Sequence, residues 1–558
     1  MTDSPHIASP LDTHEVTNQS TPLVDYDVFS SDTALVEATT TFGAAAELDE
    51  LSKLGRRTSS AEVQQWAWEA DTVPPVLHTH DRFGHRIDEV TFHPAWHNLM
   101  SEAVSHGLHA APWAEDVEAA HTKRAAGFVT WYQAEAGHGC PISMTYAAVP
   151  ALLSDPGISD EWINGLTSRT YDFGLRAPAS KAGLIAGMSM TEKQGGSDVR
   201  TNTTTATPVD GDDRTYLLNG HKFFCSAPMS DVFLVLGQAP GGLSCFLVPR
   251  VLPDGTKNVF RIQRLKNKLG NRSNASSEIE FGNTVGIRLG EEGRGVRTIV
   301  EMVSATRLDC VLGSTAVMRR ALSEAIWHTQ HRSAFGTTLI DAPLMRSVLA
   351  DLALEVEAAT WLGLRLAHAT DVATSGGPDA ERERAFRRLA LPMSKYFVCK
   401  RTPFVTFESL ECLGGAGYIE ESNMPRLFRE SPLNSIWEGS GNVNALDLLR
   451  ALGRNPESLD AWLEVIAPAR GSDAQFDTAV DDVLTMLSSG PNEAMARRLA
   501  ERMAVVLQAS LLIQHAPSAV ADAFTATRLN PLAGESTFGA RSTGAAQDLL
   551  IERAAPVV

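Results

Sequence analysis

The hydrophobic pattern of this chain changes period twice, and this change limits the folds it can adopt. Residues 46–185 carry apolar side chains at helical spacing, as at Phe128, Trp131 and Tyr132. From Leu184 to about residue 290 the pattern becomes short β-rich runs separated by Gly- and Pro-containing turn signals. After Gly295 the helical spacing returns. The pattern therefore predicts an all-β unit of about 100 residues inserted between helical regions.

Five segments follow from this pattern and from local composition. Residues 1–45 are polar and acidic, which predicts a mobile N-terminal arm with one short anchoring stretch, Pro22–Phe29. The remaining expected segments are an N-terminal α-helical domain (46–185), a middle β-barrel domain (186–290), a C-terminal helical bundle (291–455) and an additional C-terminal helical domain (456–558).

Composition excludes several classes of protein. The chain has 558 residues, 43% of them hydrophobic, which is enough for large buried cores, and its net charge of −19 opposes broad attraction to nucleic acid or anionic membrane. No apolar run is long enough for a membrane span, and the N-terminus lacks a signal-peptide pattern. The six cysteines form no CxxC pair and the 16 histidines form no HExxH pair. We therefore expect reduced thiols, no metal and a cytoplasmic location.

A first candidate binding loop is the run MSMTEKQGGSDV at residues 188–199. Two adjacent glycines are followed by Ser197 and preceded by Thr191, so the loop offers hydroxyl groups and backbone N–H groups to a polar ligand. The alternative is an ordinary polar turn between two elements.

A second candidate is the run NSIWEGSGN at residues 434–442, which carries one carboxylate, Glu438. Burial beside Ile436 and Trp437 would disfavour its charged form and raise its pKa, which suits a base that takes a proton from carbon. The alternative is a structural carboxylate in a loop.

Together these motifs resemble the acyl-CoA dehydrogenase flavoprotein family, and most closely its AidB-like branch, the adaptive-response flavoproteins linked to DNA alkylation. Further matching runs, in the same order, are FHPAWH (92–97), CPISMTYAAVP (140–150), GHKFFCS (220–226), GGLSCFLVPR (241–250), LKNKLGNRSNASSEIEF (265–281) and LGGAGY (413–418). The resemblance runs from about residue 20 to near the C-terminus. It implies an α+β multidomain fold, with N-terminal helices, a middle β-barrel, a C-terminal four-helix bundle and an extra helical domain.

The resemblance also implies a reaction. In this family a carboxylate removes the α-proton of an acyl-CoA and the β-hydride passes to FAD. Glu438 stands at the position of the base, and the family's oxyanion donors are the backbone N–H of that base and a flavin ribityl hydroxyl. The residues that match flavin contacts are Met190, Thr191, Ser197, Phe224, Cys225, Ser226, Gly439, Ser440 and Asn442.

Other positions match contacts to the FAD of a neighbouring subunit. These are Arg332, Phe335, Gly414 and Gly415. They imply a homotetramer or a dimer of dimers, and the family's electron acceptor is an electron-transfer flavoprotein. For Arg332, whose guanidinium suits a pyrophosphate, the alternative is a surface salt bridge.

Three positions bear on the acyl-CoA: Arg307, Trp437 and Ser197. Arg307 matches an arginine of the active-site helix, and it either holds the substrate or pairs with Asp309. Trp437 replaces the tyrosine common in relatives, which would narrow the acyl channel. We expect weak dehydrogenation of a short or branched acyl-CoA resembling isovaleryl-CoA.

The alternative function is a flavin-carrying protein of the adaptive response that binds double-stranded DNA and has little turnover. Candidate phosphate contacts are Arg450, Arg498 and Arg502. Residues 450–558 contain nine arginines but thirteen acidic residues, so a solvated, charge-mixed surface is an equally good interpretation.

Overall fold

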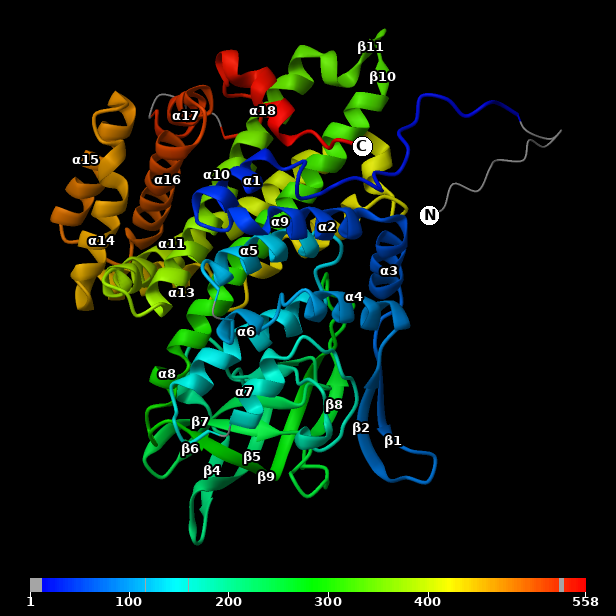
Figure 1. Ribbon diagram of the computed structural model, residues 1–558, viewed down its shortest axis with the longest axis vertical. Helices are drawn as coiled ribbons and strands as arrows, with labels where there is room; N and C mark the ends of the chain where they lie inside the picture. The colour runs from blue at the N-terminus through cyan, green and yellow to red at the C-terminus, as the bar shows by residue number, and fades with distance from the viewer. Residues whose placement is uncertain (1–12, 116, 159, 531–535) are drawn as a thin grey trace. The chain divides into compact units, whose positions relative to one another are not determined.

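The computed structural model describes residues 13–115, 117–158, 160–530 and 536–558 (Figure 1). Two compact units are present. Unit one consists of Met1–Gln65, Glu118–Ala134 and Cys310–Val558, and unit two of Trp66–Val117 and Glu135–Asp309. The helical region expected at residues 46–185 is therefore shared between the units, because α2 (Leu48–Ser59) and α5 (Ala120–Tyr132) cluster with the C-terminal helices.

Unit two is built around a sheet that has seven strands within the described residues. The strands are β3 (Ala186–Ser189), β4 (Thr205–Val209), β5 (Asp212–Ser226), β6 (Val232–Ala239), β7 (Gly242–Pro249), β8 (Arg261–Leu265) and β9 (Ser276–Leu289). Their order is β3-β6-β4-β5-β9-β7, and β7 also pairs with β6. This last pairing closes β4, β5, β6, β7 and β9 into a ring, so the sheet forms the expected barrel.

The centre of this sheet explains why the hydrophobic period changed. The residues of β6 from Val232 to Leu236 are all buried, as expected for a strand covered on both faces. Its neighbour β3 runs parallel to it, with Met188 opposite Leu234. A hydrogen bond from Phe223 N–H to the Thr191 carbonyl (2.8 Å) then ties the loop after β3 to strand β5. The two segments that match flavin contacts in this unit therefore lie side by side.

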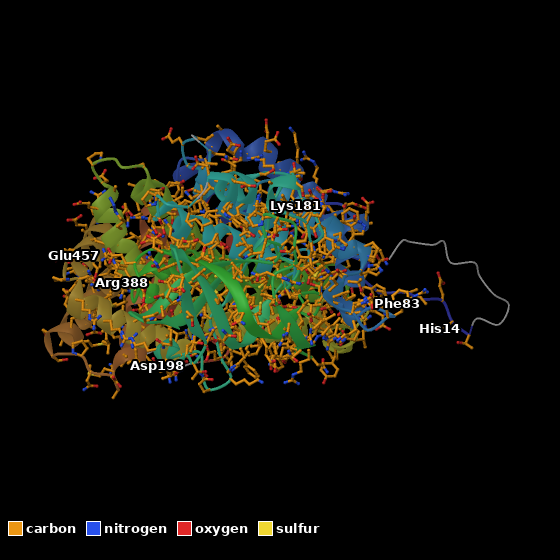
Figure 2. The ribbon with its side chains drawn as sticks, turned by 90° about the horizontal axis from the view of Figure 1, so that it is seen from below. His14, Phe83, Lys181, Asp198, Arg388 and Glu457 are labelled. Atoms are coloured by element: carbon orange, nitrogen blue, oxygen red, sulfur yellow. The ribbon has the colours of Figure 1, made fainter. Side chains whose placement is uncertain are left out.

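A β-hairpin precedes these strands and was missed by the sequence analysis, which expected mainly helices there. It consists of β1 (Val76–His80) and β2 (Arg86–Thr91). Most of its side chains are partly or fully exposed, so the strands show no clear apolar alternation. The tip carries Phe83, which is 70% exposed and lies on the surface in Figure 2. The helices of this unit are most of α3 (Ala61–Thr72), α4 (Pro94–Ser105), α6 (Gly139–Leu153), α7 (Asp160–Thr167) and α8 (Gly295–Thr298).

Unit one is mainly helical. Its long helices are α9 (Val300–His331), which begins in unit two, α10 (Pro343–Thr374) and α11 (Ala380–Cys412). α10 is buried almost continuously from Leu349 to Ala373, as expected for a helix packed on all sides. The shorter helices that follow are α12 (Met424–Glu430), α13 (Gly441–Arg454), α14 (Glu457–Ile466), α15 (Ala474–Ser488), α16 (Ala496–His515), α17 (Ser518–Phe524) and α18 (Gln547–Ala554). Figure 1 shows α14, α15 and α16 packed together, with the apolar face of α16 buried.

The expectation of a mobile N-terminal arm over residues 1–45 is wrong for residues 33–41, which follow the expected anchoring stretch Pro22–Phe29. Residues 33–41 form α1 (Thr33–Thr41), which Asp32 caps through a hydrogen bond from the Leu35 N–H. Leu23, Tyr26 and Val28 are buried together against Trp327. The buried Arg320 donates to the Leu23 carbonyl, so burial and hydrogen bonding fix this segment. Residues 1–12 lie outside the described residues.

Candidate active site

The polar loop after β3 is anchored by a buried ion pair. Glu192 and Lys222 are fully buried, with 2.8 Å between carboxylate and ammonium. Glu192 also accepts hydrogen bonds from the N–H groups of Thr203 (2.6 Å) and Thr204 (3.1 Å). Burial alone would raise the pKa of Glu192, but Lys222 and the Thr203–Thr204 segment hold it well below its usual range. Both ends of the loop are thus held against β5.

The loop itself points polar groups outward. Ser197 is exposed and Thr191 is half-buried, while the Met190 carbonyl accepts a hydrogen bond from the Asn202 amide (2.9 Å). Asp198, at the surface in Figure 2, accepts from the Arg200 N–H and closes the turn. The three residues expected to contact flavin here are therefore on one ordered, accessible loop.

Strand β5 ends with the second expected contact segment. Phe224 is 46% exposed, and Ser226 is half-buried, with its hydroxyl 3.3 Å from the Ser276 hydroxyl. Cys225 lies between them and is fully buried, and burial raises the pKa of its thiol to about 12. Because successive strand residues face opposite sides, a ligand beside Phe224 and Ser226 meets only the backbone of Cys225.

A cation fixes the aromatic side of this segment. The Lys266 ammonium lies 3.2 Å from the ring centroid of Phe223 and 4.7 Å from that of Phe224. The same ammonium pairs with Glu278 at 2.6 Å. The exposed ring of Phe224 is therefore held in place by a charge that the sequence analysis did not single out.

The loop that carries Glu438 has an unusual backbone. Glu438 has φ +55° and Gly439 φ +91°, both in the left-handed region that disfavours a side chain. The ammonium of Lys395, on α11, donates to the carbonyls of Trp437 and Gly439, each at 2.7 Å. Asn444 donates to the Gly439 carbonyl (2.6 Å) and the Ser440 carbonyl (3.1 Å). The surroundings hold this strained turn in place.

The sequence analysis expected Glu438 to be buried beside Ile436 and Trp437, and this expectation is wrong for the single chain. Ile436 is 64% exposed, and Glu438 and Trp437 are half-buried. The Trp437 ring is nevertheless fixed, because its N–H donates to the Asn434 side chain (2.8 Å), which in turn donates to the Ser314 hydroxyl (3.2 Å). The motif therefore presents an oriented indole beside a half-buried carboxylate.

The remaining expected positions lie on separate elements. Arg307 is half-buried and Asp309 buried on α9. Arg332 donates to the Asn18 carbonyl (2.6 Å), next to a hairpin of β10 (Ser333–Ala334) and β11 (Thr337–Thr338). The surface salt bridge considered for Arg332 is thus replaced by a contact with the N-terminal segment.

The tip of this hairpin and the glycine pair are open. Phe335 is fully exposed with φ +51°, and Gly336 follows with φ +80°, as in a tight hairpin turn. Gly414 and Gly415 are exposed, and a Cβ added at either would meet nothing within 4 Å. Both features leave the backbone accessible to a large ligand or another chain.

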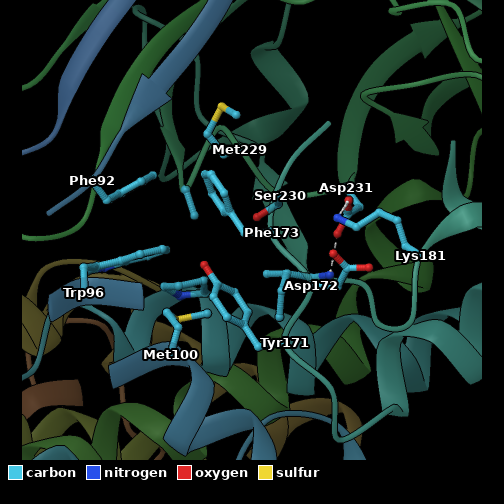
Figure 3. Close-up of a pocket in the computed structure, with 13 residues that line it drawn as sticks. Phe92, Trp96, Met100, Tyr171, Asp172, Phe173, Lys181, Met229, Ser230 and Asp231 are labelled. Atoms are coloured by element: carbon cyan, nitrogen blue, oxygen red, sulfur yellow. Dashed lines mark hydrogen bonds and ion pairs between the residues drawn. The ribbon is translucent and has the colours of Figure 1, made fainter. Parts of the chain in front are cut away.

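A small aromatic pocket lies in unit two (Figure 3). Phe92 and Trp96, from the FHPAWH run, stack with ring centroids 3.9 Å apart at one side of it. At the other side Lys181 pairs with Asp231, and burial raises the pKa of Asp231 to about 6 despite this cation. The free volume of about 20 Å³ is close to the space of one water molecule, so neither a flavin ring nor an acyl chain fits. The FHPAWH run therefore supplies a packed aromatic pair beside this pocket.

The three arginines expected to contact DNA differ from one another in exposure. Arg450 on α13 and Arg498 on α16 are exposed. Arg502 is half-buried and lies 3.8 Å from Asp482. A neighbouring carboxylate offsets its charge, which leaves Arg450 and Arg498 as the stronger candidates.

Three stretches of the chain match described domains. Residues 18–173 match the adaptive response protein AidB N-terminal domain, residues 187–284 the acyl-CoA dehydrogenase middle domain, and residues 293–453 the acyl-CoA dehydrogenase C-terminal domain. The chain is also 45% identical, over 525 residues, to the AidB protein of Escherichia coli (strain K12). This alignment covers 94% of the chain and 95% of that protein. The chain belongs to the acyl-CoA dehydrogenase family.

Other family members agree with this assignment. Acyl-CoA dehydrogenase family member 11 of Caenorhabditis elegans is 30% identical over 505 residues, covering 84% of this chain and 80% of that protein. The crystal structure of C. elegans ACDH-11 in complex with C11-CoA superposes with a TM-score of 0.84 at 26% identity, covering 94% and 95% of the two chains. The predicted family, its AidB-like branch and the predicted fold class are confirmed.

Acyl-CoA dehydrogenases are FAD-dependent oxidoreductases, and the residues of this chain fit such a cofactor. Phe224 offers an exposed flat face, and Thr191 and Ser226, in the same unit, offer hydroxyl groups. Bound flavin supplies the hydride acceptor.

The described residues contain no cluster of three or more His, Cys, Asp or Glu side chains arranged for a metal ion. Among the same residues, no helix combines the length and apolarity needed to cross a bilayer.

Proposed function

We propose that this family member catalyses α,β-dehydrogenation of an acyl-CoA thioester, with Glu438 as the base. The observation that carries the proposal is the left-handed backbone of Glu438. A non-glycine residue kept at φ +55° costs free energy, and strained positions of this kind cluster at active sites and ligand clamps, where the surrounding structure holds them. Lys395 and Asn444 hold the turn on both sides, which supports a preorganised site.

In this proposal the expected residues serve catalysis, substrate binding or FAD binding, and Ser197 serves both kinds of binding. Glu438 removes the α-proton, and its backbone N–H donates to the thioester oxygen as negative charge develops there. Arg307 and Ser197 bind the CoA ester, and Trp437 borders the acyl chain. The residues proposed to hold FAD are Met190, Thr191, Ser197, Phe224, Cys225 (through its backbone), Ser226, Gly439, Ser440 and Asn442.

The acyl group follows from the space beside Trp437. An indole held by Asn434 has little freedom to move aside, which supports a short or branched acyl-CoA resembling isovaleryl-CoA. The structure of ACDH-11 with C11-CoA supports a longer chain instead. A panel from isovaleryl-CoA to undecanoyl-CoA separates these two substrate ranges.

The test is anaerobic mixing of the FAD-loaded protein with this panel, followed by flavin absorbance. At least one acyl-CoA should bleach the flavin, and Glu438→Gln should abolish the bleaching. Glu457→Gln, an exposed carboxylate on α14, is the matched control and should behave as wild type. A Glu438→Gln protein that bleaches at the wild-type rate would remove Glu438 from the base role.

We also propose a homotetramer that passes electrons to an electron-transfer flavoprotein. Large apolar side chains on unit one are unusually exposed: Phe335 fully, Leu344 85% and Tyr418 82%. A second copy that covers them would bring Arg332, Phe335, Gly414 and Gly415 to a neighbour's FAD. Sedimentation of wild type and Arg332→Ala, with FAD content measured, tests this. A monomer that retains stoichiometric FAD would contradict it.

A second candidate function is binding of double-stranded DNA. It is favoured by the exposure of Arg450 and Arg498, and opposed by the net charge of −19. Binding through phosphates should weaken steeply with salt and fall in Arg450→Ala and Arg498→Ala. Arg502→Ala should have a smaller effect because Asp482 lies near it. Titration of a duplex at two salt concentrations checks this, and unchanged binding in both exposed-arginine variants rejects it.

A further inference from the structure

Lys395 is a buried cation whose partners are backbone carbonyls. It lies on α11 with 1% of its surface exposed. Its ammonium donates to the carbonyls of Trp437 and Gly439 at 2.7 Å each. Both of these acceptors are neutral carbonyl oxygens. Burial of an ammonium is costly even when carbonyl groups accept its hydrogen bonds, and an apolar side chain would fill the same space at less cost. Space filling therefore does not account for a charged residue at position 395.

The two carbonyls flank Glu438, and this fixes the direction of an N–H group. The Trp437 carbonyl and the Glu438 N–H belong to one peptide unit. In a trans peptide these groups point in opposite directions, and the described chain contains no cis peptide. A carbonyl held by Lys395 on one side of the loop therefore turns the Glu438 N–H to the other side.

We infer that Lys395 is a positioning residue that orients the Glu438 N–H as a donor for the thioester oxygen. This inference rests on the function proposed above, in which that N–H stabilises the developing enolate. The ammonium also polarises the Trp437–Glu438 peptide, which strengthens the N–H as a donor. Flipping of this peptide would point a carbonyl, instead of a donor, at the negative oxygen.

Because of Asn444, loss of Lys395 should affect the Trp437–Glu438 peptide more than the Gly439–Ser440 peptide. The Asn444 amide also holds the Gly439 and Ser440 carbonyls, so the Gly439–Ser440 peptide has a second support. Within the described residues, Lys395 is the donor to the Trp437 carbonyl. Loss of the ammonium should therefore release the Glu438 N–H more than the Ser440 N–H.

The test compares Lys395→Met, Lys395→Arg and the control Arg365→Met. Arg365 is a buried cation of the same unit that pairs with Glu383 at 2.9 Å, so its loss perturbs folding without touching the loop. Hydrogen exchange of residues 436–442 should speed up at least about tenfold in Lys395→Met and stay unchanged in Arg365→Met. Lys395→Arg, which keeps a cationic donor, should restore part of the protection.

Activity gives the second measurement. The rate of flavin bleaching should fall about 100-fold in Lys395→Met, the size expected for loss of one oxyanion donor. Affinity for an alkyl-CoA thioether, which lacks the carbonyl, should not change, whereas general damage to the site would lower both. A Met variant that folds, exchanges like wild type over residues 436–442 and bleaches at the wild-type rate overturns the inference. If none of the acyl-CoAs bleaches the flavin of the wild-type protein, the proposed function fails. The hydrogen-exchange data still decide whether Lys395 holds the loop.

Discussion

Replacement of Lys222 by methionine should destabilise unit two strongly, because it leaves the Glu192 carboxylate buried without its cation. Both side chains are fully buried and 2.8 Å apart. Removal of one partner of a buried pair costs about 3–5 kcal/mol, a large share of the roughly 5–15 kcal/mol that stabilises a typical domain. For a unit of this size the melting temperature should fall by roughly 6–20 °C.

The loss of stability in Lys222→Met should depend on pH, and its direction follows from the protonation of Glu192. In wild type its pKa is held below the ordinary value of 4.5, so its contribution to stability is present above pH 4.5 and is lost as pH falls through the lower folded value. In Lys222→Met, burial acts without the cation and raises the folded pKa. The carboxyl then takes up a proton on mild acidification, so the difference between variant and wild type should shrink as pH falls from 7.5 to 5.

Scanning calorimetry at several pH values measures this difference. Lys257→Met is the control, because Lys257 and Glu89 form an exposed pair that contributes at most about 1 kcal/mol. The double variant Lys222→Met with Glu192→Gln should recover much of the loss, since it removes the charge but keeps an acceptor for the Thr203 N–H. A loss below about 1 kcal/mol, or one that does not change with pH, would refute the reasoning.

Three further predictions concern other parts of the chain. Trp437→Tyr should widen the acyl channel and raise the bleaching rate with undecanoyl-CoA relative to isovaleryl-CoA; an unchanged ratio of rates would show that the indole does not limit chain length. Phe335→Gly should relieve left-handed strain of about 1 kcal/mol in the hairpin turn yet weaken assembly, which thermal melting and sedimentation together detect. All six cysteines are buried, so a thiol reagent should label none of them in the native protein at pH 8 and all six in denaturant, and burial raises the pKa of Cys245 to about 12 in support of this.

Much of the fold could be predicted from local pattern. The run Val232–Leu236 is apolar at every position, and it forms the buried strand β6. The amphipathic stretches near residues 344 and 381 begin helices α10 and α11. These elements bury large apolar surfaces, so their patterns are strong.

Elements with little burial were missed. The hairpin β1–β2 exposes most of its side chains, so its sequence shows no apolar alternation. Helix α1 buries Ala34, Leu35 and Ala38 but lies among mostly polar residues, and its order comes from contacts with distant residues such as Arg319, which pairs with the N-cap residue Asp32 at 2.9 Å. Composition near the N-terminus carries no record of those contacts.

The sequence by itself determined the family, the fold class and the position of Glu438, because these depend on short runs of residues whose order and spacing are visible in the chain. Tertiary structure decided what holds those runs in place. Lys395 reaches carbonyls 42 and 44 positions away, and Lys222 reaches a carboxylate 30 positions away. The physical reason is that a lysine bound to backbone carbonyls or to a distant carboxylate has no local signature: its partners are set by how helices and strands pack, and its neighbours in sequence face elsewhere.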